Sequence, residues 1–205
     1  MGGVEKPAVR LGGEPLLARV LRALDGCRLV SEVHVVTTPR HRVTRRIAEE
    51  LGAGVVLTPG RGYVRDLREA LGRTGTPALT VGSDLPALTP GLVERIVRLW
   101  ASLPRPSMSV WVPVRRVVRL GLSLWGRFLD RVGGVPAVPA GINVVGGVRE
   151  TPEDRVLIDD PRLACNVNTV HDLNRVRGFL GLGEQETGDE GLGAHSEARD
   201  HEQGE

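Results

Sequence analysis

Lysine, the two amide residues and the aromatic residues are all scarce in this sequence of 205 residues. Lys6 is the only lysine among 27 basic residues. Asparagine occurs only at Asn143, Asn166, Asn168 and Asn174, and glutamine only near the C-terminus. A chain that avoids these residue types makes the positions where they remain informative, so we treat Lys6 and the asparagines as candidate functional residues.

The shortage of aromatic residues, which make up 3% of the chain, argues against a nucleic-acid partner. Proteins that bind single strands stack the bases on aromatic side chains, and no such platform is present. Residues 184–205 hold eight acidic residues and one arginine, which leaves a net charge of +9 on the rest. A basic body with dispersed charge fits a small anionic ligand such as a nucleotide.

Long apolar runs are also missing. No segment approaches the ~20 apolar residues that cross a membrane, and the N-terminus lacks the apolar core of a signal peptide. We therefore expect a cytoplasmic protein with no membrane partner. Cys27 and Cys165 lack the spacing of metal ligands and are interpreted as buried thiols. The length and composition predict one domain over residues 1–182 and a disordered acidic tail over residues 183–205.

Short apolar runs alternate with amphipathic segments through much of the chain. Strands are expected at 8–11, 33–37, 54–57, 78–81, 108–113 and 155–158, and helices at 14–25, 40–51, 64–71, 90–101 and 171–180. This alternation predicts an α/β fold with a mostly parallel sheet and helices on both faces. Residues 114–138 have mixed periodicity and are expected to form a partly irregular insertion, followed by a loop that enters a strand over residues 139–145.

The first seven residues resemble the second half of a phosphate-binding loop. Gly2 and Gly3 would let the backbone approach an anion closely, and Lys6 would supply a compact positive charge. An ordinary chain terminus with one remaining lysine is the alternative, and these residues alone favour neither interpretation.

Three further groups lie where predicted strands end, which is where ligands bind in open α/β sheets. Asp84 follows the strand at 78–81 and is placed to hold Mg²⁺ beside phosphates; a turn aspartate is the alternative. Gly60, Gly62 and Tyr63, with Asp66, form either a ligand-binding loop or an ordinary tight turn.

The third group is the segment Asn166-Val167-Asn168-Thr169. Alternate residues of an extended segment point the same way, so both asparagines face one side. Thr169 is explained equally well as the cap of the following helix. That alternative leaves unexplained why two asparagines occur together in a chain that avoids them.

Five motifs, in this order and spacing, resemble the archaeal GTP:adenosylcobinamide-phosphate guanylyltransferases, which belong with the molybdenum-cofactor guanylyltransferase-like nucleotidyltransferases. They are MGGVEKP, GRGYVRDL, GSDL, PAGINVV and NVNTVHDL. The resemblance implies a Rossmann-like nucleotidyltransferase fold. It also implies transfer of GMP from GTP to adenosylcobinamide phosphate, which gives adenosylcobinamide-GDP and pyrophosphate in cobalamin synthesis.

The resemblance also implies roles for individual residues. Lys6 and Asp84 would be catalytic, and Mg²⁺ would be held by Asp84 with Asn168 as a second contact. The nucleotide and acceptor would be bound by Gly2, Gly3, Lys6, Gly60, Gly62, Tyr63, Asn143 and Asn168. The segment 139–143 would face the acceptor. A homodimer is left open.

Members of that family begin earlier, with a strand and a Gly-Gly-x-Gly-Thr-Arg loop that runs into the equivalent of Met1–Pro7. The resemblance therefore implies that Met1 is an internal methionine and that the true start lies upstream. Two alternatives to the main prediction remain: a guanylyltransferase for another acceptor, such as molybdenum cofactor, and a non-catalytic GTP-binding protein.

Overall fold

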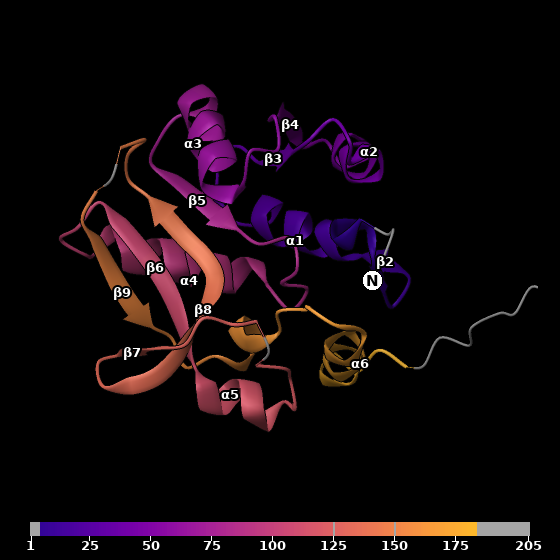
Figure 1. Cartoon of the computed structure of the whole chain (residues 1–205), viewed down its shortest axis with the longest axis vertical. Coiled ribbons are helices and arrows are strands. Elements are labelled where there is room, and N and C mark those ends of the chain that lie inside the picture. The colour runs from indigo at the N-terminus through magenta and orange to yellow at the C-terminus, as the bar shows by residue number, and fades with distance from the viewer. Residues whose placement is uncertain (1–4, 125, 150, 184–205) are drawn as a thin grey trace, which may run out of the picture.

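The structure is a computed structural model that describes residues 5–124, 126–149 and 151–183. Figure 1 shows strands and helices alternating along the chain. The helices are α1 Leu16–Asp25, α2 Arg42–Glu50, α3 Tyr63–Thr74, α4 Pro90–Ala101, α5 Val114–Arg119 and α6 Val170–Phe179, with short 3₁₀ helices η1 Lys6–Ala8 and η2 Pro161–Ala164. The strands are β1 Arg10–Leu11, β2 Glu14–Pro15, β3 His34–Thr37, β4 Gly54–Leu57, β5 Ala78–Val81, β6 Ser107–Pro113, β7 Asp130–Val132, β8 Val135–Val145 and β9 Glu153–Leu157.

The main sheet has five strands in the order β5-β8-β6-β9, with β7 paired to β8. β8 is antiparallel to β5, β6 and β7, whereas β6 and β9 are parallel. Four of these five strands therefore run in one direction and β8 alone runs against them. This confirms the predicted α/β fold with a mostly parallel sheet.

Residues 114–138 are partly irregular, as predicted: residues 120–124 and 126–129, between α5 and β7, lie outside helices and strands. One part of the sequence prediction is wrong. The segment 139–143 is not a loop, because it lies inside the 11-residue strand β8. Pro136 and Pro139 suggested a break in the chain, but β8 accommodates proline with a register shift opposite residues 109–111 of β6.

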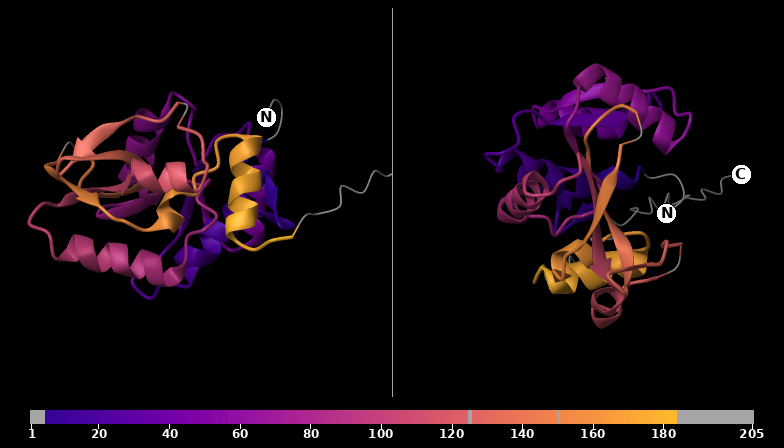
Figure 2. Two further views of the ribbon diagram at one scale, coloured as in Figure 1. Left: turned by 90° about the horizontal axis from the view of Figure 1, so that it is seen from below. Right: turned by 90° about the vertical axis from the view of Figure 1, so that its left-hand side faces the viewer.

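The largest core cluster lies between the main sheet and the helices α1 and α4. The apolar residues of α1 recur at helical spacing, so Leu16 and Val20 face this core. α4 begins as the sequence predicts: the Thr89 hydroxyl accepts a hydrogen bond from the Leu92 N–H, and Pro90 is the first helical residue. α3 lies on the other side of the sheet from α4 (Figure 2).

β3 and β4 form a separate two-stranded parallel sheet, so β3 and β5 each end a sheet without pairing with each other. A cavity of about 660 Å³ lies between them. Its lining includes Leu17 and Leu21 of α1, Leu67 and Ala70 of α3, and residues of both strands. All four residues of β5 are half-buried, whereas all seven of β6, which has partners on both sides, are buried.

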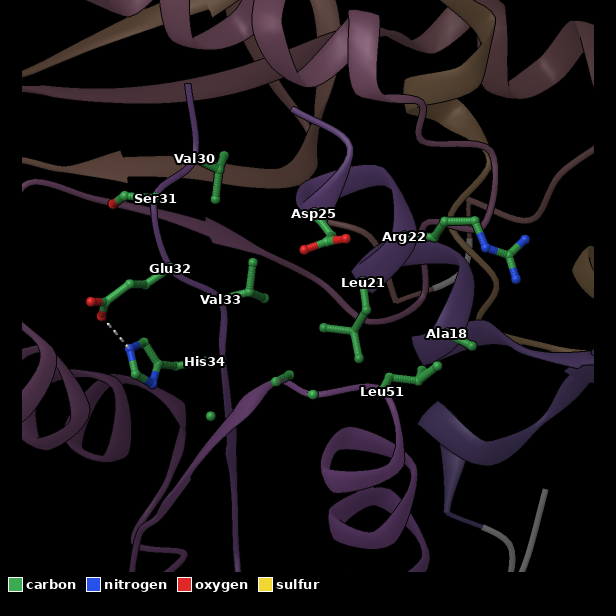
Figure 3. A pocket seen from close by; sticks show the side chains of 13 residues that line it. Ala18, Leu21, Arg22, Asp25, Val30, Ser31, Glu32, Val33, His34 and Leu51 are labelled. Atoms are coloured by element: carbon green, nitrogen blue, oxygen red, sulfur yellow. Dashed lines mark hydrogen bonds and ion pairs between the residues drawn. The ribbon is translucent and has the colours of Figure 1, made fainter. Parts of the chain in front are cut away.

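A smaller cavity of about 460 Å³ adjoins the first, between α1 and the β3–β4 pair. Figure 3 shows Leu21 and Val33 along it and the side chains of Glu32 and His34 joined by a hydrogen bond of 3.2 Å. This cavity is lined by neither Lys6 nor Asp84.

Among the described residues, no helix is long and apolar enough to cross a membrane. The predicted acidic tail lies outside the described residues except for Gly183, and the division into domain and tail stays a prediction.

Candidate active site

Lys6, Asp84 and Asn168 meet at one point, although 162 residues separate the first from the last. The Lys6 Nζ lies 2.5 Å from Asp84 Oδ2 and 2.9 Å from Asn168 Oδ1. The side chain of Asp84 is 18% exposed and that of Lys6 is 35% exposed, so the cluster is open to solvent on one side. The structure therefore brings together three of the residues that the sequence singles out.

Asp84 is positioned by the end of β5 and by the segment that precedes α6. Beyond β5, the Gly82 N–H continues the pairing with β8 by donating to the Gly141 carbonyl. The Asp84 carbonyl then accepts a hydrogen bond of 3.0 Å from the Val167 N–H. The two asparagines on either side of Val167 are thereby held against the carboxylate of Asp84.

Asn166 binds the second oxygen of the same carboxylate, since its Nδ2 lies 3.2 Å from Asp84 Oδ1. Asn166 and Asn168 thus converge on one cluster, as their alternate spacing predicts. The Asn166 Oδ1 is buried and has no hydrogen-bond partner among the described residues. An unpaired buried acceptor is costly, and it lies beside the candidate site.

Asp172 holds the asparagine segment in place through hydrogen bonds to its backbone. Its side chain is fully buried and accepts hydrogen bonds from the N–H groups of Ser123, Asn168 and Thr169. The Thr169 hydroxyl in turn accepts from the Asp172 N–H, which completes a capping box at the start of α6. Thr169 is therefore explained as a helix cap, as the alternative interpretation proposed, and the asparagines are not.

Glu5 fixes the segment that carries Lys6. Its carboxylate accepts hydrogen bonds from the Val43 N–H and from the N–H and hydroxyl of Thr44, at the start of α2. Burial opposes ionisation of Glu5, but the hydrogen bonds from Thr44 and Val43 outweigh it and lower its pKa. Glu5 thus contacts the chain just beyond β3 while Lys6 contacts the chain just beyond β5.

The loop at Gly60–Tyr63 is a tight turn organised by Asp66. The Asp66 carboxylate accepts hydrogen bonds from the N–H groups of Gly60, Arg61 and Gly62. Gly60 and Gly62 have φ values of 76° and 106°, which explains why both are glycine. Tyr63 is 70% exposed and lines the larger cavity together with Asp84.

The remaining residues of the sequence-derived site are Gly2, Gly3 and Asn143. Gly2 and Gly3 lie outside the described residues. Asn143 lies within β8 opposite Thr80 of β5, and among the described contacts it makes no hydrogen bond to Lys6, Asp84 or Asn168. Their assigned roles stay predictions.

Arg127 belongs to the site but was missed by the sequence analysis. Its Nη2 donates to the Asn166 carbonyl at 3.0 Å and its Nε donates to the Ser123 carbonyl at 2.8 Å. Burial lowers the pKa of this guanidinium, against the attraction of Asp172 and Asp84. Arg127 lies in the segment where periodicity was mixed, among many other arginines, so the sequence carried no signal for it.

The oxygen atoms of the cluster suit a hard cation. Asp84 and Asn168 present a carboxylate and an amide oxygen, and the Lys6 ammonium stands between them where a cation would bind. No group of three or more His, Cys, Asp or Glu side chains gathers as a metal site in the described chain. One protein carboxylate suits Mg²⁺, which keeps several water ligands and is also bound by substrate phosphates.

Burial raises the pKa of Cys165 to about 12, so that thiol is inert at neutral pH.

Comparison with known proteins decides the family. Residues 1–153 match the model of the MobA-like NTP transferase domain. The chain belongs to that family. A relative, the adenosylcobinamide-phosphate guanylyltransferase of Methanocaldococcus jannaschii, is 28% identical over 183 residues, which covers 84% of this chain and 87% of the relative. The MobA-like chain is therefore a nucleotidyltransferase, as its motifs predict.

Solved structures place the MobA-like chain in the Rossmann-like nucleotidyltransferase fold. A CMP:2-keto-3-deoxy-manno-octonic acid synthetase complexed with CTP matches with a TM-score of 0.61 at 16% identity, over 86% of this chain and 91% of the synthetase. A 4-diphosphocytidyl-2C-methyl-D-erythritol synthase matches with a TM-score of 0.62 at 14% identity, over 85% and 94% respectively. At these identities the two structures establish the fold alone.

Proposed function

We propose that this nucleotidyltransferase moves GMP from GTP to adenosylcobinamide phosphate, releasing pyrophosphate and forming adenosylcobinamide-GDP. The observation that carries the proposal is the convergence of Lys6, Asp84 and Asn168 at the end of β5. A cation, a carboxylate and an amide oxygen at a strand end are the groups that a triphosphate and its metal require. The choice of acceptor is supported by the name of the relative from Methanocaldococcus jannaschii.

The chemistry is an in-line displacement at phosphorus. An oxygen of the acceptor's phosphate forms a bond to the α-phosphorus of GTP, the bond from that phosphorus to the bridging oxygen breaks, and pyrophosphate leaves with the electron pair. A phosphate monoester is already an anion near pH 7, because its second pKa is about 6. The protein therefore needs no strong general base, and its task is to hold two anions together in the right geometry.

Lys6 supplies the positive charge for this task. Its position beside Asp84, anchored through Glu5 to the start of α2, directs the ammonium toward the end of β5. In the proposed complex Lys6 turns from Asp84 to the triphosphate. Asp84 and Asn168 would then hold Mg²⁺, which when bound supplies positive charge to the phosphate oxygens.

A guanylyl-transfer assay tests the proposal. The protein is incubated with Mg²⁺, GTP and either adenosylcobinamide phosphate or molybdenum cofactor, both as the 205-residue chain and in a form extended upstream of Met1. We expect product with adenosylcobinamide phosphate and little with molybdenum cofactor. The reverse preference would assign the second acceptor, and absence of transfer from both forms would contradict the proposal.

Binding without turnover is the alternative that the open sheet edges favour, since among the described strands β3 and β5 both lack a partner on one side. Titration of the 205-residue chain with Mg-GTP distinguishes it from the enzyme. Micromolar binding with turnover supports the transferase, whereas binding without turnover in either form would leave a GTP-binding protein.

A further inference from the structure

Arg127 and Arg177 are the half-buried arginines of the described chain that no carboxylate neutralises directly, and of the two only Arg127 is hydrogen-bonded to a residue that contacts Asp84. It is half-buried, and in the described part of the chain no carboxylate oxygen lies within 4.0 Å of its guanidinium. Its hydrogen bonds go to two backbone carbonyls, of Ser123 and Asn166. By contrast, Arg162 of η2, which is also half-buried, is paired with Asp160 at 2.7 Å.

The two nearest acidic side chains are already engaged. Asp172 accepts three backbone N–H groups, and Asp84 is paired with Lys6. A partly desolvated cation is costly unless an anion accompanies it. Because the guanidinium stays charged at every pH of interest, an anion bound from outside the described chain would offset this cost.

Arg127 and Lys6 are connected to different oxygens of the Asp84 carboxylate. Lys6 contacts Oδ2 of the carboxylate directly. Oδ1 accepts from Asn166, and the carbonyl of Asn166 accepts from Arg127. In-line transfer brings two anionic groups to opposite sides of the reacting phosphorus, so a site of this kind needs positive charge on two sides of its metal-binding carboxylate.

We propose that Arg127 binds the phosphate group of the acceptor, while Lys6 serves the triphosphate of the nucleotide. The inference rests on the proposed transfer reaction. A guanidinium suits this task because it forms two parallel hydrogen bonds to a phosphate. The Asn166 carbonyl holds the guanidinium beside Asp84, so the acceptor's phosphate is presented next to the residue that holds the metal.

The test compares binding of adenosylcobinamide phosphate with binding of adenosylcobinamide, which lacks the phosphate, by calorimetry without GTP. In the wild-type chain the phosphorylated ligand should bind at least about tenfold more tightly, a modest value for one charge-assisted contact. In Arg127→Gln this preference should fall to within about twofold. Arg131→Gln, which changes an exposed arginine nearby, is the matched control and should keep it.

Each other outcome is decisive. A tenfold preference retained by Arg127→Gln would overturn the proposal. If both ligands bind equally more weakly and the melting temperature falls, Arg127 only ties the segment at 123–127 to Asn166. That result would also overturn the proposal. If the wild-type chain binds neither ligand, the proposed acceptor is wrong. Stabilisation of the chain by inorganic phosphate then tests Arg127 alone. Loss of this stabilisation in Arg127→Gln supports a phosphate site, and persistence of the stabilisation rejects one.

Discussion

Single residues account for most of what the sequence revealed about the site. The lone lysine and two of the four asparagines meet at Asp84, as expected from their scarcity and their positions at strand ends. Arg127 could not be found in this way, because one arginine among many carries no signal. Its position depends on where α5 and the following loop fold, which periodicity did not resolve.

Asp84→Asn should lower the rate of guanylyl transfer at least about 100-fold, since the amide keeps the size of the side chain but loses the charge that would hold the proposed Mg²⁺. Initial rates with saturating GTP measure the effect, and circular dichroism checks the fold. Asp159→Asn changes an exposed carboxylate that pairs with Arg115 and Arg116, so it should leave the rate unchanged. A rate near wild type for Asp84→Asn would remove Asp84 from the metal site.

Lys6→Ala should weaken GTP binding about tenfold or more, because a charge-assisted contact with phosphate contributes roughly 1.5–3 kcal/mol. The dissociation constant of Mg-GTP, measured by calorimetry, gives the change. Arg28→Ala, at an exposed position outside the cluster, is the control for loss of one positive charge. Unchanged affinity in Lys6→Ala would show that the ammonium serves only the ion pair with Asp84.

At the scale of elements, the sequence predicted those with strong periodicity and clear end signals. β4, β5 and α4 have the predicted bounds, because a capping threonine, a first-turn proline or flanking glycines mark their ends. The segment 139–143 was mispredicted as a loop because its proline is typical of loops, whereas pairing with β6 and β5 keeps it extended. Strand pairing of this kind depends on residues far apart in the sequence, so local patterns do not predict it.

The anchor between η1 and α2 should depend on pH through Glu5. Its pKa is lower in the folded chain than its ordinary value of 4.5, so its contribution to stability is present above that pH and is lost as the pH falls through the folded value. Glu5→Gln should lower the melting temperature at pH 7 by roughly 2–4 °C, the effect of about 1 kcal/mol from a helix cap.

From pH 7 to pH 3 the difference between wild type and Glu5→Gln should shrink, because the Glu5 carboxylate is progressively protonated. The other acidic groups with lowered pKa values, Asp130, Asp159 and Asp160, titrate in both proteins and cancel in the comparison. Thermal unfolding of both proteins at the two pH values makes the measurement. An equal difference at pH 3 and pH 7 would mean that the carboxylate charge does not carry the anchor.

The whole molecule differs from a closed α/β sandwich in one respect, the gap between β3 and β5. The sequence-derived expectation that a strand precedes Met1 stays a prediction, and the open edges give it a physical reason. A two-stranded sheet is marginal by itself, and unpaired strand edges expose backbone groups. Helices α1 and α3 line the gap, so a strand placed there would be covered on both faces and would need apolar side chains.

Hydrogen exchange tests the open edge directly. Hydrogen-bonded pairs alternate in antiparallel strands, and Gly82 donates to Gly141, so the N–H groups of Leu79 and Val81 point away from β8 toward the gap. These two amides should exchange at least about 100-fold faster than that of Thr80. In a form extended upstream by an apolar strand they should become protected. Equal protection of all three amides in the 205-residue chain would show that the gap is closed in solution.

The central claim is that the cluster around Asp84 transfers GMP to a phosphorylated acceptor. Mass spectrometry of a reaction containing Mg²⁺, GTP and adenosylcobinamide phosphate tests it most directly. The account predicts adenosylcobinamide-GDP and pyrophosphate in equal amounts, formed by the wild type and not by Asp84→Asn. Formation of GDP and inorganic phosphate instead, or GTP bound and left unchanged in the 205-residue and upstream-extended forms alike, would contradict it.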